Sequence, residues 1–135
     1  MTNMITGNCC CGDVAFTLDD DFSDFFFCYC EQCRKLTGTA HSAHLFTSPD
    51  NINWINGTGK IKRYDHEERS FSKAFCENCG SGLPFLTKSG KSLIVPAGSL
   101  NEEPAKKLDA QMFCAEETEW HKTGSNVAKF SGFPK

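Results

Sequence analysis

Short runs of alternating apolar and polar residues, each closed by a turn residue, recur along this chain. Glycine, asparagine, aspartate and proline return roughly every eight to twelve residues, a spacing typical of short strands joined by turns. The run at 93–95 is apolar and β-branched and ends at Pro96, which favours a buried strand. Strands are predicted over 13–18, 24–28, 53–57, 60–64, 69–75, 93–95 and 111–113.

Helical patterns are sparse by comparison. One turn is predicted over 31–36 and another over 101–107, where Pro104 limits its length. A chain of 135 residues fits one domain, so we expect residues 1–135 to form a small, mostly β domain of short antiparallel strands. Six aromatic residues are expected in its core: Trp54, Phe71, Phe75, Phe85, Phe113 and Trp120.

Charge and the amino-terminal sequence limit the partners. The net charge of −3 gives no basic footprint for nucleic acid and no attraction to anionic membranes. Residues 1–7 lack the apolar run of a signal peptide, and no stretch has the length of a membrane span. A cytoplasmic location is therefore expected, where stable disulfides are rare and cysteines more often bind metal or act in redox chemistry.

Nine cysteines are present, an odd number that a framework of disulfides alone would not use up. Cys76 and Cys79 form a C-x-x-C pair, followed by Gly80. Two sulfurs at this spacing can bind one metal ion and supply half of a tetrahedral zinc site. A thioredoxin-like redox pair is the alternative, but the sequence from Gly80 to Pro84 is a poor start for the helix that such a motif requires.

The other half of that site is predicted near the amino terminus. In an extended segment Cys9 and Cys11 point to the same side, and Cys10 points away. We interpret Cys10 as a small buried apolar residue. With Cys76 and Cys79, the pair would complete a closed, structural site of four thiolates.

Cys28, Cys30 and Cys33 supply three sulfurs from one short loop. Three protein ligands and one open position are typical of catalytic zinc. The alternative is a second structural site, with Cys114 or a histidine as its fourth ligand. Arg34 and Lys35 follow directly; they would favour the thiolate form and could receive a carboxylate of a bound ligand, or they are simply exposed charges.

His41 and His44 follow the second cysteine group and are spaced closely enough to share a metal. We interpret them as strand or core histidines rather than ligands.

Three ordered motifs give the chain a resemblance to a known family. They are Gly7-Asn8-Cys9-Cys10-Cys11-Gly12, then Cys28-Tyr29-Cys30-Glu31-Gln32-Cys33-Arg34-Lys35, and Phe75-Cys76-Glu77-Asn78-Cys79-Gly80. On these the sequence resembles the glutathione-dependent formaldehyde-activating enzymes, a family that includes centromere protein V, over about residues 7–133. Family members commonly have histidines where this chain has Tyr29 and Gln111.

That resemblance implies a β-rich fold with two zinc ions per chain. It assigns Cys9, Cys11, Cys76 and Cys79 to a structural zinc. It assigns Cys28, Cys30 and Cys33 to the zinc at which chemistry occurs. The implied activity is that of a carbon–sulfur lyase or synthase, which joins a small thiol such as glutathione to a small aldehyde such as formaldehyde and gives S-hydroxymethylglutathione, or runs the reverse reaction.

A non-catalytic zinc module that binds a partner protein is the competing hypothesis. It needs no open position beside Cys28, Cys30 and Cys33, so a fourth protein ligand there would favour it. The sequence sets no oligomeric state.

Overall fold

This computed structural model describes residues 3–134, and three small β-sheets form the framework of the fold. The first sheet has the order β1-β2-β5 and is antiparallel throughout. Its strands are β1 (Met4–Asn8), β2 (Ala15–Asp19) and β5 (Asn53–Asn56). Every second side chain of β1 and β2 is buried, as the period of two in a strand dictates.

The largest sheet has the order β11-β3-β4-β10-β9. Its pairs are antiparallel, except that β11 runs parallel to β3. The bounds of its strands are β3 (Asp24–Cys28), β4 (Ser42–Thr47), β9 (Phe85–Leu86), β10 (Leu93–Pro96) and β11 (Ala110–Met112).

The third sheet, β6-β7-β8, is an antiparallel hairpin with a two-residue third strand. Its strands are β6 (Ile61–Asp65), β7 (Ser72–Cys76) and β8 (Gly82–Leu83). One core joins the three sheets, and its fully buried members include Val14, Phe16, Leu45, Leu83 and Val95.

Helices are few and short. The longest is α1 (Glu31–Thr37). Cys30 is its N-cap, and Gly38, in the left-handed conformation, is its C-cap. A single turn, α2 (Glu119–Lys122), follows near the carboxyl end. The 3-10 turns are η1 (Thr58–Lys60), η2 (Ala97–Ser99), η3 (Cys114–Glu116) and η4 (Gly124–Asn126).

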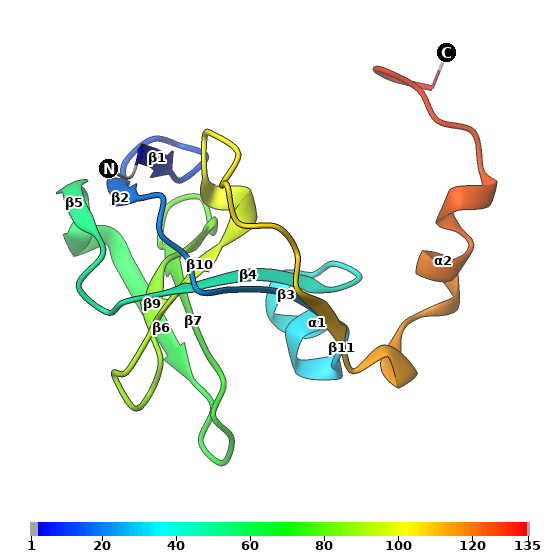
Figure 1. The fold of residues 1–135 in the computed structure, drawn as a ribbon, viewed down its shortest axis with the longest axis horizontal. Helices are drawn as coiled ribbons and strands as arrows, with labels where there is room; N and C mark the ends of the chain where they lie inside the picture. The colour runs from blue at the N-terminus through cyan, green and yellow to red at the C-terminus, as the bar shows by residue number, and fades with distance from the viewer. Residues whose placement is uncertain (1–2, 135) are drawn as a thin grey trace.

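Figure 1 shows how these parts are arranged. The β1-β2-β5 sheet lies at one end of the body, and α1 and β11 lie at the other. Beyond β11 the chain leaves the body and runs past α2 as an arm that ends away from the sheets. In the described part of the chain, no helix has the length and apolar character needed to cross a membrane.

The predicted mostly β class is confirmed, and each predicted strand overlaps an observed one. The helical turn over 31–36 is also confirmed as α1. The turn predicted over 101–107 is wrong, since no helix forms there and Pro104 interrupts the segment. Two of the expected core aromatics are wrong as well: Phe113 is 58% exposed and Trp120 is 64% exposed, because both belong to the arm rather than to a sheet.

Candidate metal centres and the cavity beside them

Four cysteine sulfurs come together where β1 and β7 end. Cys9 and Cys11 follow β1, and Cys76 closes β7 just before Cys79. The sulfurs of Cys9 and Cys11 are 3.6 Å apart and those of Cys11 and Cys76 are 3.8 Å apart. All four lie within 4.8 Å of one another. A tetrahedral zinc with bonds of about 2.3 Å places its sulfurs about 3.8 Å apart, so this group fits the ion.

Two tight turns bring these sulfurs together. In the first, Gly12 takes a φ of +82° and its amide donates to the carbonyl of Cys9 at 3.0 Å. In the second, Gly80 takes a φ of +76° and its amide donates to the carbonyl of Cys76 at 2.8 Å. Glycine adopts such angles without steric cost, which explains the glycine after each cysteine pair.

Amide and hydroxyl groups also favour the ionised form of one sulfur in this group. The Ser81 hydroxyl lies 3.2 Å from the Cys79 sulfur, and together with the Ser81 amide it lowers the pKa of the Cys79 thiol to about 5. A thiolate is the form that binds metal.

The second group, Cys28, Cys30 and Cys33, lies where β3 meets α1. Cys28 ends β3, Cys30 caps the amino end of α1, and Cys33 lies in its first turn. The Cys33 amide donates to the Cys30 sulfur at 3.4 Å. All three side chains are buried, and their sulfurs lie within 4.8 Å of one another.

Burial makes this group a poor place for thiolates unless a cation joins them. It raises the pKa of the Cys28 thiol and, more strongly, that of Cys33. A soft divalent ion such as zinc supplies that charge, so the donor set fits one. Among residues 3–134, no fourth cysteine, histidine or carboxylate brings a donor atom into the group. Cys114, one candidate, is exposed and its sulfur donates to the Gln111 carbonyl at 3.6 Å.

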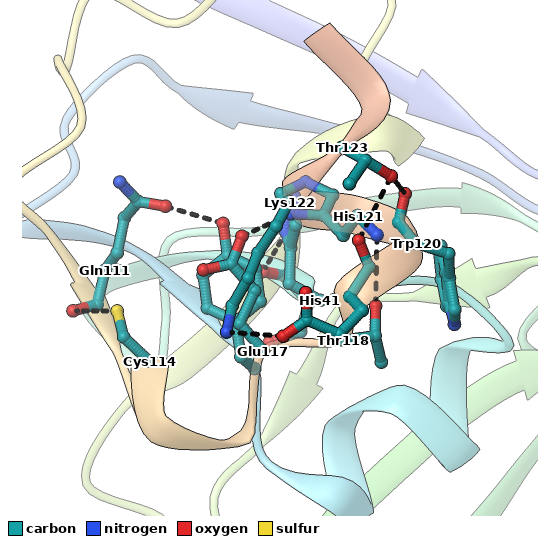
Figure 2. A network of polar contacts seen from close by, with 12 residues as sticks. His41, Gln111, Cys114, Glu117, Thr118, Trp120, His121, Lys122 and Thr123 are labelled. Atoms are coloured by element: carbon teal, nitrogen blue, oxygen red, sulfur yellow. Dashed lines mark hydrogen bonds and ion pairs between the residues drawn. The ribbon is translucent and has the colours of Figure 1, made fainter. Parts of the chain in front are cut away.

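One face of this cysteine loop is covered by the segment that begins the arm. The Tyr29 hydroxyl donates to the Gln111 side chain at 2.6 Å, and the Tyr29 amide donates to the Met112 carbonyl at 3.0 Å. The Tyr29 ring also packs beside those of His41 and His121, with centroids 5.0 and 5.3 Å away. Figure 2 shows the network around Gln111, His41 and His121. Tyr29 is only 2% exposed, so this face is closed.

The other side opens on a cavity of about 810 Å³, within the range of small-molecule sites. Cys28 and Cys33 line it, next to Ser42 and His44 of β4. Burial lowers the pKa of His44 to about 4, so this histidine is neutral near pH 7. Much of the remaining wall is apolar: Phe26, Leu36, Phe46, Phe71, Leu83, Phe85, Ile94, Met112 and Phe113.

Other residues singled out from the sequence take different places. The prediction that Cys10 is buried is wrong: it is exposed and lines the cavity, because the tight turn at Gly12 leaves it outside the sulfur group. His44 is a partly buried strand residue, as interpreted, and His41 stacks on Phe27 with centroids 4.2 Å apart.

The cations of the cavity are not the ones that the sequence suggested. Arg34 and Lys35 lie on α1 and are not among the residues that line it. Lys73 of β7 and Lys88 line it instead. Lys73 lies three residues before Cys76, but that motif belongs to the other sulfur group, and Lys88 lies farther from any cysteine. Only the fold brings Lys73 to this site, where its Nζ donates to the Leu36 carbonyl of α1.

Comparisons with known proteins show the fold and the family of this chain. An uncharacterized lyase of Schizosaccharomyces pombe is 28% identical over 86 residues, which are 64% of this chain and 60% of that protein. A Rhodobacter sphaeroides protein of known crystal structure has the same fold, with a TM-score of 0.61 and 18% identity over 79% of this chain and 98% of its own. The family model named glutathione-dependent formaldehyde-activating enzyme matches residues 4–116. The chain therefore belongs to the family of glutathione-dependent formaldehyde-activating enzymes.

Proposed function

We propose that this protein is a zinc-dependent carbon–sulfur lyase that makes or cleaves adducts of a small thiol and a small aldehyde. The observation that carries the proposal is the cavity beside Cys28, Cys30 and Cys33. Two of these three sulfurs reach its wall, and no fourth protein ligand closes the group within residues 3–134. A closed structural site or a protein-binding module would have no use for such an opening, so the enzyme is the better explanation.

Two zinc ions are proposed, in different roles. The four-cysteine group would hold one ion as a structural link between the ends of β1 and β7. The three-cysteine group would hold the other, which when bound favours the thiolate form of a thiol and polarises a carbonyl oxygen.

In the forward direction the reaction is an addition. The thiol sulfur forms a bond to the aldehyde carbon, the carbon–oxygen double bond becomes a single bond, and the proton of the thiol ends on the new hydroxyl group. The reverse reaction breaks the carbon–sulfur bond and returns that proton to sulfur. No oxidant or reductant is needed in either direction.

The chain's own residues bind and orient the reactants. Phe26, Phe71 and Phe85 line the same cavity as Cys28 and Cys33 and would give the bound reactants an apolar surface. Holding thiol and aldehyde side by side there supplies much of the rate gain, since a bimolecular step becomes effectively unimolecular.

Glutathione and formaldehyde, the pair in the family description, are the substrates to test first. With ¹³C-formaldehyde, exchange between free aldehyde and the S-hydroxymethyl adduct is measured by NMR at equilibrium. Zinc-loaded protein should accelerate exchange above the spontaneous rate, and Cys30→Ser should remove the acceleration. Cys114→Ser, a change at an exposed cysteine outside both groups, is the matched control. Exchange at the spontaneous rate with zinc-loaded wild type would refute the proposal for this pair.

A further inference from the structure

Two cations line the cavity beside the three-cysteine group. They are Lys73 and Lys88, and no aspartate or glutamate lines it. His44 adds no charge near pH 7, because burial keeps it neutral. Away from the cysteines and their proposed zinc, the charged side chains of the lining are therefore both positive and attract an anionic group.

Lys73 is the cation better placed to meet a ligand at the cysteines. Its side chain is only partly exposed, and its Nζ donates to the Leu36 carbonyl in the last turn of α1. Leu36 and Cys33 are three residues apart on one helix and line the same cavity. The ammonium is therefore held about one helical turn, roughly 5 Å, along α1 from the level of Cys33.

No carboxylate of residues 3–134 forms an ion pair with Lys73. An ammonium has three N–H groups, and the bond to Leu36 uses one. The other two have no acceptor among residues 3–134 and can donate to a ligand. Lys88 differs, because it is exposed and donates to the carbonyls of both His66 and Arg69.

Ser42 adds a polar group to the cysteine site itself. It is 1% exposed, and its hydroxyl is a hydrogen-bond neighbour of the Cys33 sulfur. It lies on β4 opposite Cys28 in the strand register, and both residues line the cavity. Ser42 therefore supports the sulfur group, and Lys73 is left as the group for a more distant part of the ligand.

We propose that Lys73 binds a carboxylate of the thiol substrate while the sulfur of that substrate lies at Cys28, Cys30 and Cys33. The inference rests on the proposed function, because it takes the three-cysteine group as the place where the thiol binds. It makes Lys73, rather than Arg34 or Lys35, the residue that selects an anionic thiol. Lys88 also lines the cavity and adds to the positive field without fixing the carboxylate.

The test compares glutathione with its diethyl ester, in which two neutral ethyl esters replace the two carboxylates. Glutathione and its diethyl ester are titrated calorimetrically into the zinc-loaded wild type and into Lys73→Met, which keeps the apolar stem and removes the ammonium. We expect the change to weaken glutathione binding at least tenfold and to leave the diester unaffected. Lys73→Arg should restore most of the loss, and Arg34→Gln/Lys35→Gln, the matched control, should bind glutathione as the wild type does.

The remaining outcomes distinguish failure of this inference from failure of the proposed function. Equal losses for both thiols, or no loss for either, would overturn the role of Lys73 and leave the enzyme standing. If wild type binds neither thiol, the proposed function fails and the inference fails with it. Zinc content and circular dichroism of each variant establish that a loss does not come from misfolding.

Discussion

The nine cysteines of this protein differ chiefly in whether their sulfur atoms lie next to the sulfurs of other cysteines. Seven lie in two groups, whereas Cys10 and Cys114 are exposed and outside both. Cys10 and Cys11 are adjacent in the sequence, yet only Cys11 belongs to a group. The environment of each sulfur, rather than residue type, therefore decides what a mutation costs.

Cys79→Ser should remove the structural ion and destabilise the whole fold. The four-cysteine group links the ends of β1 and β7, which belong to different sheets, so losing the ion breaks a connection between them. We expect the free energy of unfolding to fall by roughly 4 kcal/mol or more, as is typical when a structural metal is lost. Urea denaturation with zinc analysis measures both effects.

Cys10→Ala is the matched control for that change. Cys10 lies between Cys9 and Cys11, in the other turn of the four-cysteine group, but its sulfur is outside the group. The change should therefore alter stability by less than about 0.5 kcal/mol and leave the zinc content unchanged. If Cys79→Ser and Cys10→Ala unfold at the same urea concentration, the four-cysteine group is not a structural zinc site.

His44 makes the stability of the fold depend on pH. Burial lowers its pKa to about 4 in the folded state, against an ordinary value of 6.5. Between these values the unfolded chain binds the proton more readily, so stability falls as pH drops through this window. The loss from His44 alone is about 2 kcal/mol at pH 5 and near zero at pH 7.

His44→Leu tests that dependence. The variant should lose less stability than the wild type when urea unfolding is repeated at pH 7 and at pH 5, by about 2 kcal/mol. Parallel losses in the two proteins would mean that His44 is solvated and protonates normally in the fold.

Tyr29 and Gln111, two positions at which the sequence is expected to differ from the family, are hydrogen-bond partners. The Tyr29 hydroxyl donates to the Gln111 side chain at 2.6 Å. The sequence did not predict this contact, because only the parallel pairing of β11 with β3 brings Gln111 beside the cysteine loop. The hydrogen bond closes the loop on this side.

At the scale of elements, α1 has two roles that a mutation can separate. Its N-cap is Cys30, whose sulfur accepts from the Cys33 amide and is also one of the three candidate ligands. Serine is among the best N-cap residues, whereas its hydroxyl is a poor ligand for a soft metal. Cys30→Ser therefore keeps the start of the helix and weakens the metal site.

We expect Cys30→Ser to stay folded, with a urea midpoint close to that of the wild type, and to bind one zinc tightly instead of two. Zinc release to a chromogenic chelator counts the ions, and the rate of release separates tight from weak sites. A variant as unfolded as Cys79→Ser would instead mean that both groups are structural.

At the scale of the whole molecule, the sequence predicted the strands and the two cysteine groups, but it did not predict which residues line the cavity. Period-two alternation and cysteine spacing are local signals, and both survive folding. The cavity depends on how β7, β4 and α1 pack, which no local pattern encodes. For that reason the sequence did not predict Ser42 or Lys73 as site residues. It predicted Arg34 and Lys35 instead, because they directly follow a cysteine motif.

The last part of the arm, after α2, is the segment whose removal should matter least to the stability of the body. Val127, Phe130 and Phe133 are 64%, 54% and 91% exposed, so they add little to the core. Figure 1 shows this segment leading away from the sheets, and it lies beyond the residues that the family model matches. A chain ending at Thr123 should keep its zinc content and lose less than about 0.5 kcal/mol of stability.

A chain ending at Met112 should behave differently. It would lose the side chain of Glu116, which accepts from the Glu31 amide at 3.0 Å at the start of α1, and the ring of His121, which packs beside Tyr29. The cysteine loop would then be less well covered, so its zinc should be released faster than in the chain ending at Thr123. The chain ending at Thr123 could instead lose more than about 2 kcal/mol of stability. If sedimentation also shows that the full-length chain is a dimer and that this deletion dissociates it, the apolar side chains of the arm pack on a second copy.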